Sequence, residues 1–462
     1  MERIENRTFD ELQVGDTASI VRTLSNRDIE LFAVMSGDIN PAHVDPEFAK
    51  SDLFHEVVAH GMWGGALFSA VLGTELLGPG TIYLGQTLRF KRPVKLGDTV
   101  TVSVSVAQKH PENHRITLDC VASNQRGETV IDGVAEIIAP TQKISRPRTI
   151  LPEVQFHRRG HQYERLIHQA RGLAPIRVAV VHPVDTVCLL GAVEAAKANI
   201  IVPVLVGPEA RIRAAAAQAK IDISPYELVP TEHSHAAASA AAALARDHKV
   251  DALMKGSLHT DEFMGAILCE EKLRTGRRMS HVFVIDAPGY PRPLFVTDAA
   301  INIYPDLAEK RDIVVNAIEL AHALGVAEPR VAILSAVETV TDKIKSTLDA
   351  AALCKMADRG QITGAILDGP LAFDNAVSEE AARTKGIVSP VAGRADIFVV
   401  PDLEAGNMLA KQLEYLADAQ VAGIVLGARV PVILTSRADK TLARLGSCAI
   451  ALLLSHHSRR VE

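Results

Sequence analysis

The residues with the clearest chemical potential lie near the N-terminus, in the stretch SGDINPAHVDPEFA, residues 36–49. Asp38 and His43 flank an Asn40-Pro41 pair. Because proline disfavours helix in the residue before it, this segment is expected to turn and bring the two side chains together. A carboxylate beside an imidazole can hold and polarise a water molecule, since one accepts hydrogen bonds and the other exchanges a proton near neutral pH. The spacing therefore predicts hydration chemistry.

Taken alone, a capping aspartate and a structural histidine explain this fragment equally well. Two further fragments favour the chemical interpretation. In AHGMWGG, Gly61 begins an apolar helix, whose free N–H groups can hold a thioester carbonyl as its enolate develops. FKRPVKLGDTV then places Gly97 and Asp98 directly before an alternating strand. Asp45 and Pro46 are expected to begin a short helix that closes the far end of the loop.

The elements that must position these residues form a first domain over residues 1–140. TVTVSVSV, residues 99–106, alternates apolar and polar side chains, which predicts a strand with one buried face. RITLDCVASN and ETVIDGVAEIIA follow with short turns, so three strands are expected to form an antiparallel meander. The earlier segment VVAHGMWGGALFSAVLGTELL is small or apolar nearly all round, as expected for a helix wrapped by a sheet.

The motif S-G-D-x-N-P-x-H, the HG that follows it and F-x-x-P-V-x-x-G-D together resemble the MaoC-like hot-dog family, specifically its R-specific enoyl-CoA hydratases, over roughly residues 10–140. The resemblance implies a hot-dog fold and a dimer. It also implies that Asp38 and His43 activate the water added across a 2-enoyl-CoA double bond. The backbone N–H at Gly61 would serve the thioester oxygen, and Asn40 is assigned to substrate binding. Phe32 stands where a tyrosine is frequent in the family.

A linker over residues 141–160 separates this domain from a second one, over residues 161–462. Short continuous apolar runs such as IRVAVV, IIVPVLVG and RVAIL alternate there with helical segments. This rhythm predicts an α/β domain with parallel strands buried on both faces. So many strands rarely form a single sheet, so two lobes are expected.

Hydroxyl and basic residues of the second domain could bind a small dianion. LTSRADKT places Ser436 and Arg437 just after a buried strand, where a hydroxyl, a guanidinium and backbone N–H groups can meet a phosphate. LRTGRRMS supplies Arg274 and Arg277. A solvated charged face is the alternative explanation for either cluster. Asn407 lies in PDLEAGNM, a loop expected at the carboxyl edge of the sheet, where ligands of α/β proteins gather.

A second resemblance, to the phosphate acetyl/butyryltransferase family over roughly residues 160–460, is carried by the fragments MKGSLHTDEF, SHVFV, DGPLAFDNA, PDLEAGNMLAKQL and TSRAD. It implies two α/β lobes of the isocitrate/isopropylmalate dehydrogenase-like fold, with a cleft in which acyl groups move between CoA and inorganic phosphate. It assigns Ser436 and Arg437 to the CoA and phosphate site. The reaction also requires a base and a phosphate clamp. Asp439 is the candidate base, and Arg274 and Arg277 are the candidate clamp.

Two positions depart from the acetyltransferase members of that family. Those members carry an arginine shortly after the His-Thr segment, where this chain has Gly265 or a neighbour. They also carry an aspartate seven residues after the serine of the Ser-Arg pair, where this chain has Ala443. The chain is therefore expected to lie closer to the butyryltransferase branch or to another relative.

Composition excludes several classes of partner. The net charge of −6 provides no overall basic field for nucleic acid or an anionic membrane. The charged N-terminus and the lack of a spanning apolar run predict a cytoplasmic protein. The five cysteines form no CxxC pair, and the histidine pairs His233/His235 and His456/His457 have no carboxylate or Cys partner at ligand spacing, so neither a metal nor a bound cofactor is expected.

Both domains point to acyl-CoA as a substrate, so the sequence predicts a bifunctional hydratase and phosphate acyltransferase that forms a homo-oligomer, a dimer or larger. CoA thioesters and phosphate or acyl phosphate are the expected ligands. Two alternatives stay open. The hot-dog domain could be a dimerisation or thioester-binding module without catalysis. The second domain could instead be a non-catalytic CoA-binding scaffold, as the missing arginine and aspartate would allow.

Overall fold

The computed structural model describes residues 3–149, 154, 160–434 and 441–461. The chain divides into two compact units, Met1–Val154 and Gln155–Glu462. This division falls within the predicted linker. The first unit nevertheless extends past residue 140, because the short strand β7 (Ser145–Pro147) pairs with β1 (Arg3–Glu5) at the start of the chain.

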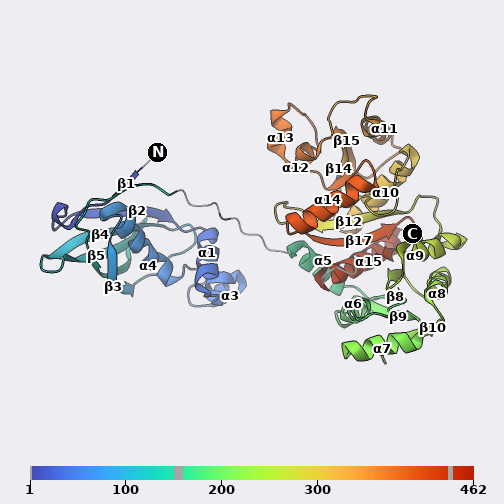
Figure 1. Ribbon diagram of the computed structural model, residues 1–462, viewed down its shortest axis with the longest axis horizontal. Coiled ribbons are helices and arrows are strands. Elements are labelled where there is room, and N and C mark those ends of the chain that lie inside the picture. The colour runs from blue at the N-terminus through green and yellow to red at the C-terminus, as the bar shows by residue number, and fades with distance from the viewer. Residues whose placement is uncertain (1–2, 150–153, 155–159, 435–440, 462) are drawn as a thin grey trace. The chain divides into compact units, whose positions relative to one another are not determined.

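The first unit is an antiparallel sheet of five strands packed against one central helix (Figure 1). The strands follow the spatial order β2 (Thr17–Thr23), β4 (Thr99–His110), β5 (Arg115–Asn124), β6 (Thr129–Ile138) and β3 (Ile82–Phe90). The helix is α4 (Gly61–Ala70), which continues as one π-helical segment, η2 (Val71–Leu76). Alternate side chains of β4 are buried, as the sequence pattern predicts. The hot-dog fold is confirmed, with its core between the sheet and this helix.

Three short helices lie between β2 and α4, and local capping positions them. Ser25 caps α1 (Asn26–Ser36), whose end is marked by Gly37 with φ 75°. Asn40 caps α2 (Pro41–Val44), and Asp45 caps α3 (Pro46–Ser51). The predicted helix start at Asp45 and Pro46 is therefore confirmed.

The second unit contains one continuous sheet of eleven strands, covered by helices (Figure 1). In spatial order these are β10 (Glu227–Pro230), β9 (Ile201–Gly207), β8 (Ile176–Val181), β11 (Ala252–Lys255), β18 (Val432–Ile433), β17 (Gln420–Leu426), β12 (Ser280–Asp286), β13 (Leu294–Thr297), β16 (Ile397–Val399), β14 (Arg330–Leu334) and β15 (Ile366–Leu371). The helices are α5 (His161–Arg171), α6 (Thr186–Lys197), α7 (Glu209–Ala219), α8 (Ser234–Arg246), α9 (Thr260–Cys269), α10 (Leu307–Ala323), α11 (Lys345–Asp358), α12 (Phe373–Val377), α13 (Glu379–Thr384), α14 (Leu403–Leu416) and α15 (Thr441–Val461).

The α/β class is confirmed, but the expectation that the strands would separate into more than one sheet is wrong. Strand β12 pairs antiparallel with both β13 and β17, and β17 pairs antiparallel with β18. These central pairs join two outer, parallel sets of strands into one mixed sheet. The two predicted lobes therefore share a single hydrogen-bonded sheet. Among the described residues, every helix is too short or too polar to cross a bilayer.

One buried ion pair joins two helices of the second unit. Lys310 on α10 places its Nζ atom 2.7 Å from Oδ2 of Asp349 on α11, and both side chains are buried. Each charge compensates the desolvation of the other.

Candidate active sites

The loop that carries Asp38 is held mostly by short local hydrogen bonds. The Oδ1 atom of Asp38 accepts the backbone N–H of Asn40 at 3.2 Å. The side-chain oxygen of Asn40 accepts the N–H of Ala42 at 3.1 Å and thereby caps α2. The structure thus gives Asn40 a clear part in shaping the loop, and its contact with substrate stays a prediction.

Two histidines flank Asp38, and backbone carbonyls decide which nitrogen of each neutral ring carries the proton. Nδ1 of His43 lies 2.8 Å from the carbonyl oxygen of Val58. Nε2 of His60 lies 3.0 Å from the main-chain oxygen of Asp38. A carbonyl oxygen can only accept, so these two nitrogens are the donors. The lone pairs therefore reside on Nε2 of His43 and on Nδ1 of His60.

The structure brings Asp38, His43 and His60 together. One carboxylate oxygen and one nitrogen of each ring all lie within 4.8 Å of one another. Two imidazoles and a carboxylate at this separation form a donor set that could hold a divalent cation. Sequence reasoning identified Asp38 and His43 but missed His60. The available signal was its position directly before Gly61, at the start of the apolar helix.

A cavity of about 320 Å³ opens beside this group. Its walls include His43, His60 and Gly61, together with the apolar side chains of Trp63, Phe90 and Ile131. Gly61 is the first residue of α4, where backbone N–H groups have no acceptor within the helix. A Cβ atom there would lie 3.1 Å from the Phe90 ring, so glycine lets this ring pack closely against the start of the helix. The cavity can therefore hold an apolar chain beside polar groups.

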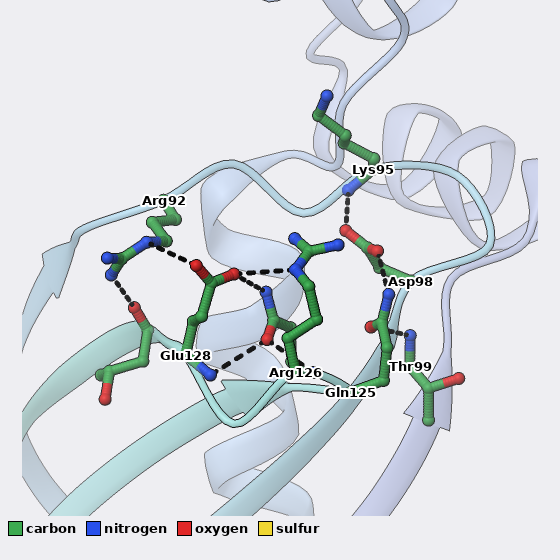
Figure 2. Close-up of polar contacts among 9 residues, drawn as sticks. Arg92, Lys95, Asp98, Thr99, Gln125, Arg126 and Glu128 are labelled. Carbon is green, nitrogen blue, oxygen red and sulfur yellow. Dashed lines mark hydrogen bonds and ion pairs between the residues drawn. The ribbon is translucent and has the colours of Figure 1, made fainter.

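The segment between β3 and β4 forms another wall of the cavity, and a polar network holds it in place (Figure 2). Asp98 accepts the backbone N–H of Lys95 at 2.9 Å and the side-chain amide of Gln125 at 2.6 Å. Burial opposes the charge on Asp98, but these hydrogen bonds outweigh it and hold the pKa of Asp98 below its ordinary value. Asp98 is thus a structural carboxylate that ties this wall to the β5–β6 turn.

Arg92 and Arg126 both form ion pairs with Glu128. Nε of Arg92 lies 3.7 Å and Nε of Arg126 lies 2.9 Å from the carboxylate of Glu128 (Figure 2). Hydrogen bonds from Asn124 and then Arg126 lower the pKa of Glu128. Arg92, which lines the cavity, is therefore partly neutralised by Glu128.

In the second unit, the described candidate residues for phosphate binding form hydrogen bonds or ion pairs with other protein groups. Nε of Arg274 donates to the carbonyl oxygen of Leu268 at 2.7 Å. Nη2 of Arg277 lies 2.6 Å from Oε2 of Glu319. The Asn407 amide donates to a main-chain oxygen at 3.2 Å. The structure gives each of these three residues a structural contact, and their roles toward phosphate stay predictions.

Ser436, Arg437 and Asp439 lie outside the described residues, so their places in a site stay predictions. The strand before them, β18, pairs in parallel with β11, with Met254 opposite Ile433. The chain therefore leaves both strands at the same carboxyl edge of the sheet, the edge at which ligands of α/β proteins bind.

Sequence reasoning missed a buried histidine at this edge. His182 follows β8, and its Nδ1 lies 2.8 Å from the carbonyl oxygen of Ser257, just beyond β11. Its Nε2 is buried and makes no hydrogen bond to any described residue. The backbone at Gly256 passes so close that a Cβ atom would lie 2.3 Å from the oxygen of Val181. The only signal in the sequence was a histidine directly after an apolar run.

Two family models match the chain. The model described as phosphate acetyl/butaryl transferase matches residues 231–452, and the model described as MaoC like domain matches residues 13–124.

A phosphate acetyltransferase of Rhizobium meliloti is 61% identical over 302 residues, which are 65% of this chain and 96% of the relative. A phosphate butyryltransferase of Clostridium acetobutylicum is 42% identical over 294 residues, 63% of this chain and 98% of the relative. The solved R-hydratase PhaJ1 from Pseudomonas aeruginosa is 46% identical, with a TM-score of 0.33, and the match covers 34% of this chain and 99% of that one.

The expectation of a closer relation to the butyryltransferases is wrong for these relatives. Identity is 61% to the acetyltransferase and 42% to the butyryltransferase. Gly265 and Ala443 therefore do not place this chain on the butyryl branch.

Proposed function

Because this chain belongs to the phosphate acetyl/butyryl transferase family through its second unit, we propose that it is a bifunctional acyl-CoA enzyme. The second unit transfers a short acyl group between CoA and phosphate. The first unit hydrates a 2-enoyl-CoA to an (R)-3-hydroxyacyl-CoA. The observation that carries the hydratase assignment is the convergence of Asp38 with the His43 ring, beside a cavity in a MaoC-like domain.

In the hydration step, Nε2 of His43 takes a proton from water while the carboxylate of Asp38 accepts the second hydrogen bond of that water. The oxygen forms a bond to C3, and the electrons of the double bond move to the thioester oxygen. The N–H of Gly61 stabilises this enolate oxygen. Return of one proton to C2 completes the addition and restores the neutral imidazole.

In the transfer step, the sulfur of CoA forms a bond to the carbonyl carbon of an acyl phosphate, and the bond to phosphate breaks. Inorganic phosphate leaves with the electron pair of that bond, and the thiol proton passes to a base. Ser436 and Arg437 bind the phosphate in this proposal, and Asp439 is the proposed base. The reaction runs in either direction without any further reactant.

We also propose that the chain assembles through β3. This strand lies at the edge of the five-stranded sheet, where its outer backbone groups can pair with another strand. Ile82, Tyr83, Leu84 and Phe90 on it are large, apolar or aromatic, and exposed. A second copy of the same edge would cover them. Light scattering on the purified chain measures the mass directly, and a monomer contradicts this assembly.

A panel of acyl-CoAs tests both activities separately. Loss of the enoyl absorbance reports hydration, and phosphate-dependent release of free thiol reports acyl transfer. Arg437→Ala should abolish thiol release and leave hydration intact. Thiol release without hydration by the unmodified chain would leave the first unit as a binding or assembly module. Hydration without thiol release would make the second unit a CoA-binding scaffold.

A further inference from the structure

His60 is a buried residue of the first unit to which the hydration steps above assign no role. It is 2% exposed and stands directly before Gly61, at the start of α4. Its Nε2 lies 3.0 Å from the main-chain oxygen of Asp38. Its ring centroid lies 4.1 Å from that of His43, with 36° between the ring planes. One side chain therefore contacts both members of the proposed catalytic pair.

The hydrogen bond from His60 to Asp38 joins residues much further apart in the sequence than the other hydrogen bonds of Asp38 do. It joins residues 22 positions apart and so ties the loop to the central helix. The other described hydrogen bonds to the Asp38 backbone and carboxylate join residues two positions apart. Local bonds shape the turn but do not place it relative to α4. The His60 bond supplies that placement.

The ring of His60 also packs on two sides. Phe32 lies against it, with ring centroids 4.9 Å apart, and His43 lies closer still. Phe32 belongs to α1 and His43 to α2, so the His60 ring fixes the spacing between three helices. The orientation of the His43 ring then depends on two contacts, the Val58 carbonyl at Nδ1 and the face of His60.

We propose that His60 is a positioning residue of the hydration site, an inference that rests on the proposed hydratase function. Its N–H holds the Asp38 loop against α4, and its ring face orients His43. It acts through these two residues. Its Nδ1 atom is buried and makes no hydrogen bond to any described residue.

Two variants separate the two contacts. His60→Phe keeps a ring and removes the donor, whereas His60→Gln keeps an N–H donor and removes the ring. Loss of the donor should lower kcat for enoyl-CoA hydration about tenfold, as expected for a lost buried hydrogen bond, with KM within about threefold. His60→Gln should recover most of that loss. A merely structural residue would not show this split between kcat and KM or this rescue.

The matched control is His55→Gln, which changes an exposed histidine of the same unit and should leave both constants unchanged. Phosphate-dependent thiol release by the second unit confirms that each variant chain is intact. Fluorescence of Trp63, the single tryptophan of the chain, reports the folding of the first unit. An unchanged kcat in folded His60→Phe overturns the proposal. So does a His60→Gln variant that is no more active than His60→Phe.

A spectroscopic test does not depend on turnover. Nitrogen-15 chemical shifts of labelled histidines in the full chain should show His60 as the Nε2–H tautomer and His43 as the Nδ1–H tautomer. A His60 ring protonated on Nδ1 instead overturns the proposal even if the enzyme is active. The chain could instead show both expected tautomers and yet hydrate no enoyl-CoA. That result would overturn the hydratase function but not the contact between His60 and Asp38.

Discussion

The Nδ1 atom of His43 lies 2.8 Å from the carbonyl oxygen of Val58, and this contact directs the lone pair of the neutral ring to Nε2. The His43 ring lies near the Asp38 carboxylate, and its Nε2 can act as a base without any change of tautomer. Asp38→Ala and His43→Ala should each lower kcat for hydration by about 10²–10⁴-fold, because each removes one partner of the attacking water.

The second unit provides the control for these two variants. Its residues lie in a separate compact unit, so phosphate-dependent thiol release should stay at the level of the unmodified chain. Hydration that persists in both variants would exclude this pair as the catalytic site.

Asp98 should make the stability of the first unit depend on pH. Hydrogen bonds from Gln125 and Lys95 outweigh burial and hold the pKa of Asp98 below its ordinary value. A carboxyl group with a lowered folded pKa stabilises the fold above its unfolded pKa, about 3.9, and this contribution is lost as the pH falls through the folded pKa. The difference in unfolding free energy between the unmodified chain and Asp98→Asn should therefore be largest at neutral pH and shrink below about pH 4.

Urea unfolding followed by Trp63 fluorescence measures this difference in the first unit alone, because Trp63 is the single tryptophan. Asp119→Asn, at an exposed position of the same sheet, is the matched comparison. A difference that stays constant from pH 7 to about pH 3 would rule out the role assigned to Asp98.

Gly133 on β6 leaves no space for a side chain next to β3. A Cβ atom at this position would lie 1.9 Å from the carbonyl oxygen of Thr87 on β3, and backbone cannot move aside as a side chain can. Gly133→Ala should lower the free energy of unfolding of the first unit by about 1–3 kcal/mol. Gly73→Ala has open space around its new methyl group and lies in η2, so it should be neutral or stabilising by up to about 1 kcal/mol. Equal urea midpoints for the two variants would contradict this explanation.

Replacing only one member of the buried ion pair Lys310–Asp349 should strongly lower the free energy of unfolding. Lys310→Met leaves the Asp349 carboxylate buried without its partner, and we expect a loss of about 3–5 kcal/mol. The double variant Lys310→Met/Asp349→Leu should recover much of that loss, because no charge then remains buried. Circular dichroism during urea unfolding measures both.

The exposed pair Lys355–Asp358, with Nζ and Oδ2 2.6 Å apart, is the matched control. Lys355→Met should change stability by less than about 1 kcal/mol, since water screens an exposed pair. A similar loss of unfolding free energy in Lys310→Met and Lys355→Met would show that burial does not determine the effect of losing the lysine.

Local secondary structure could be predicted from the amino-acid sequence alone. The alternation of TVTVSVSV predicts β4, Asp45 and Pro46 predict the start of a short helix, and the Asp38/His43 motif predicts a converging pair. Each of these depends on residues within about ten positions of one another. Dihedral preferences, capping bonds and side-chain alternation act over that range, so the sequence determines them without knowledge of the fold.

Tertiary structure decided what depends on distant partners. His60 reaches Asp38 across 22 positions, and only the packing of α4 against the loop makes that contact. Arg277 contacts Glu319 on α10, which no local pattern indicates. The eleven strands join into one sheet because β12 and β17 pair antiparallel at its centre. Strand order and buried partners are settled by which surfaces exclude water together, and that information is spread over the whole chain.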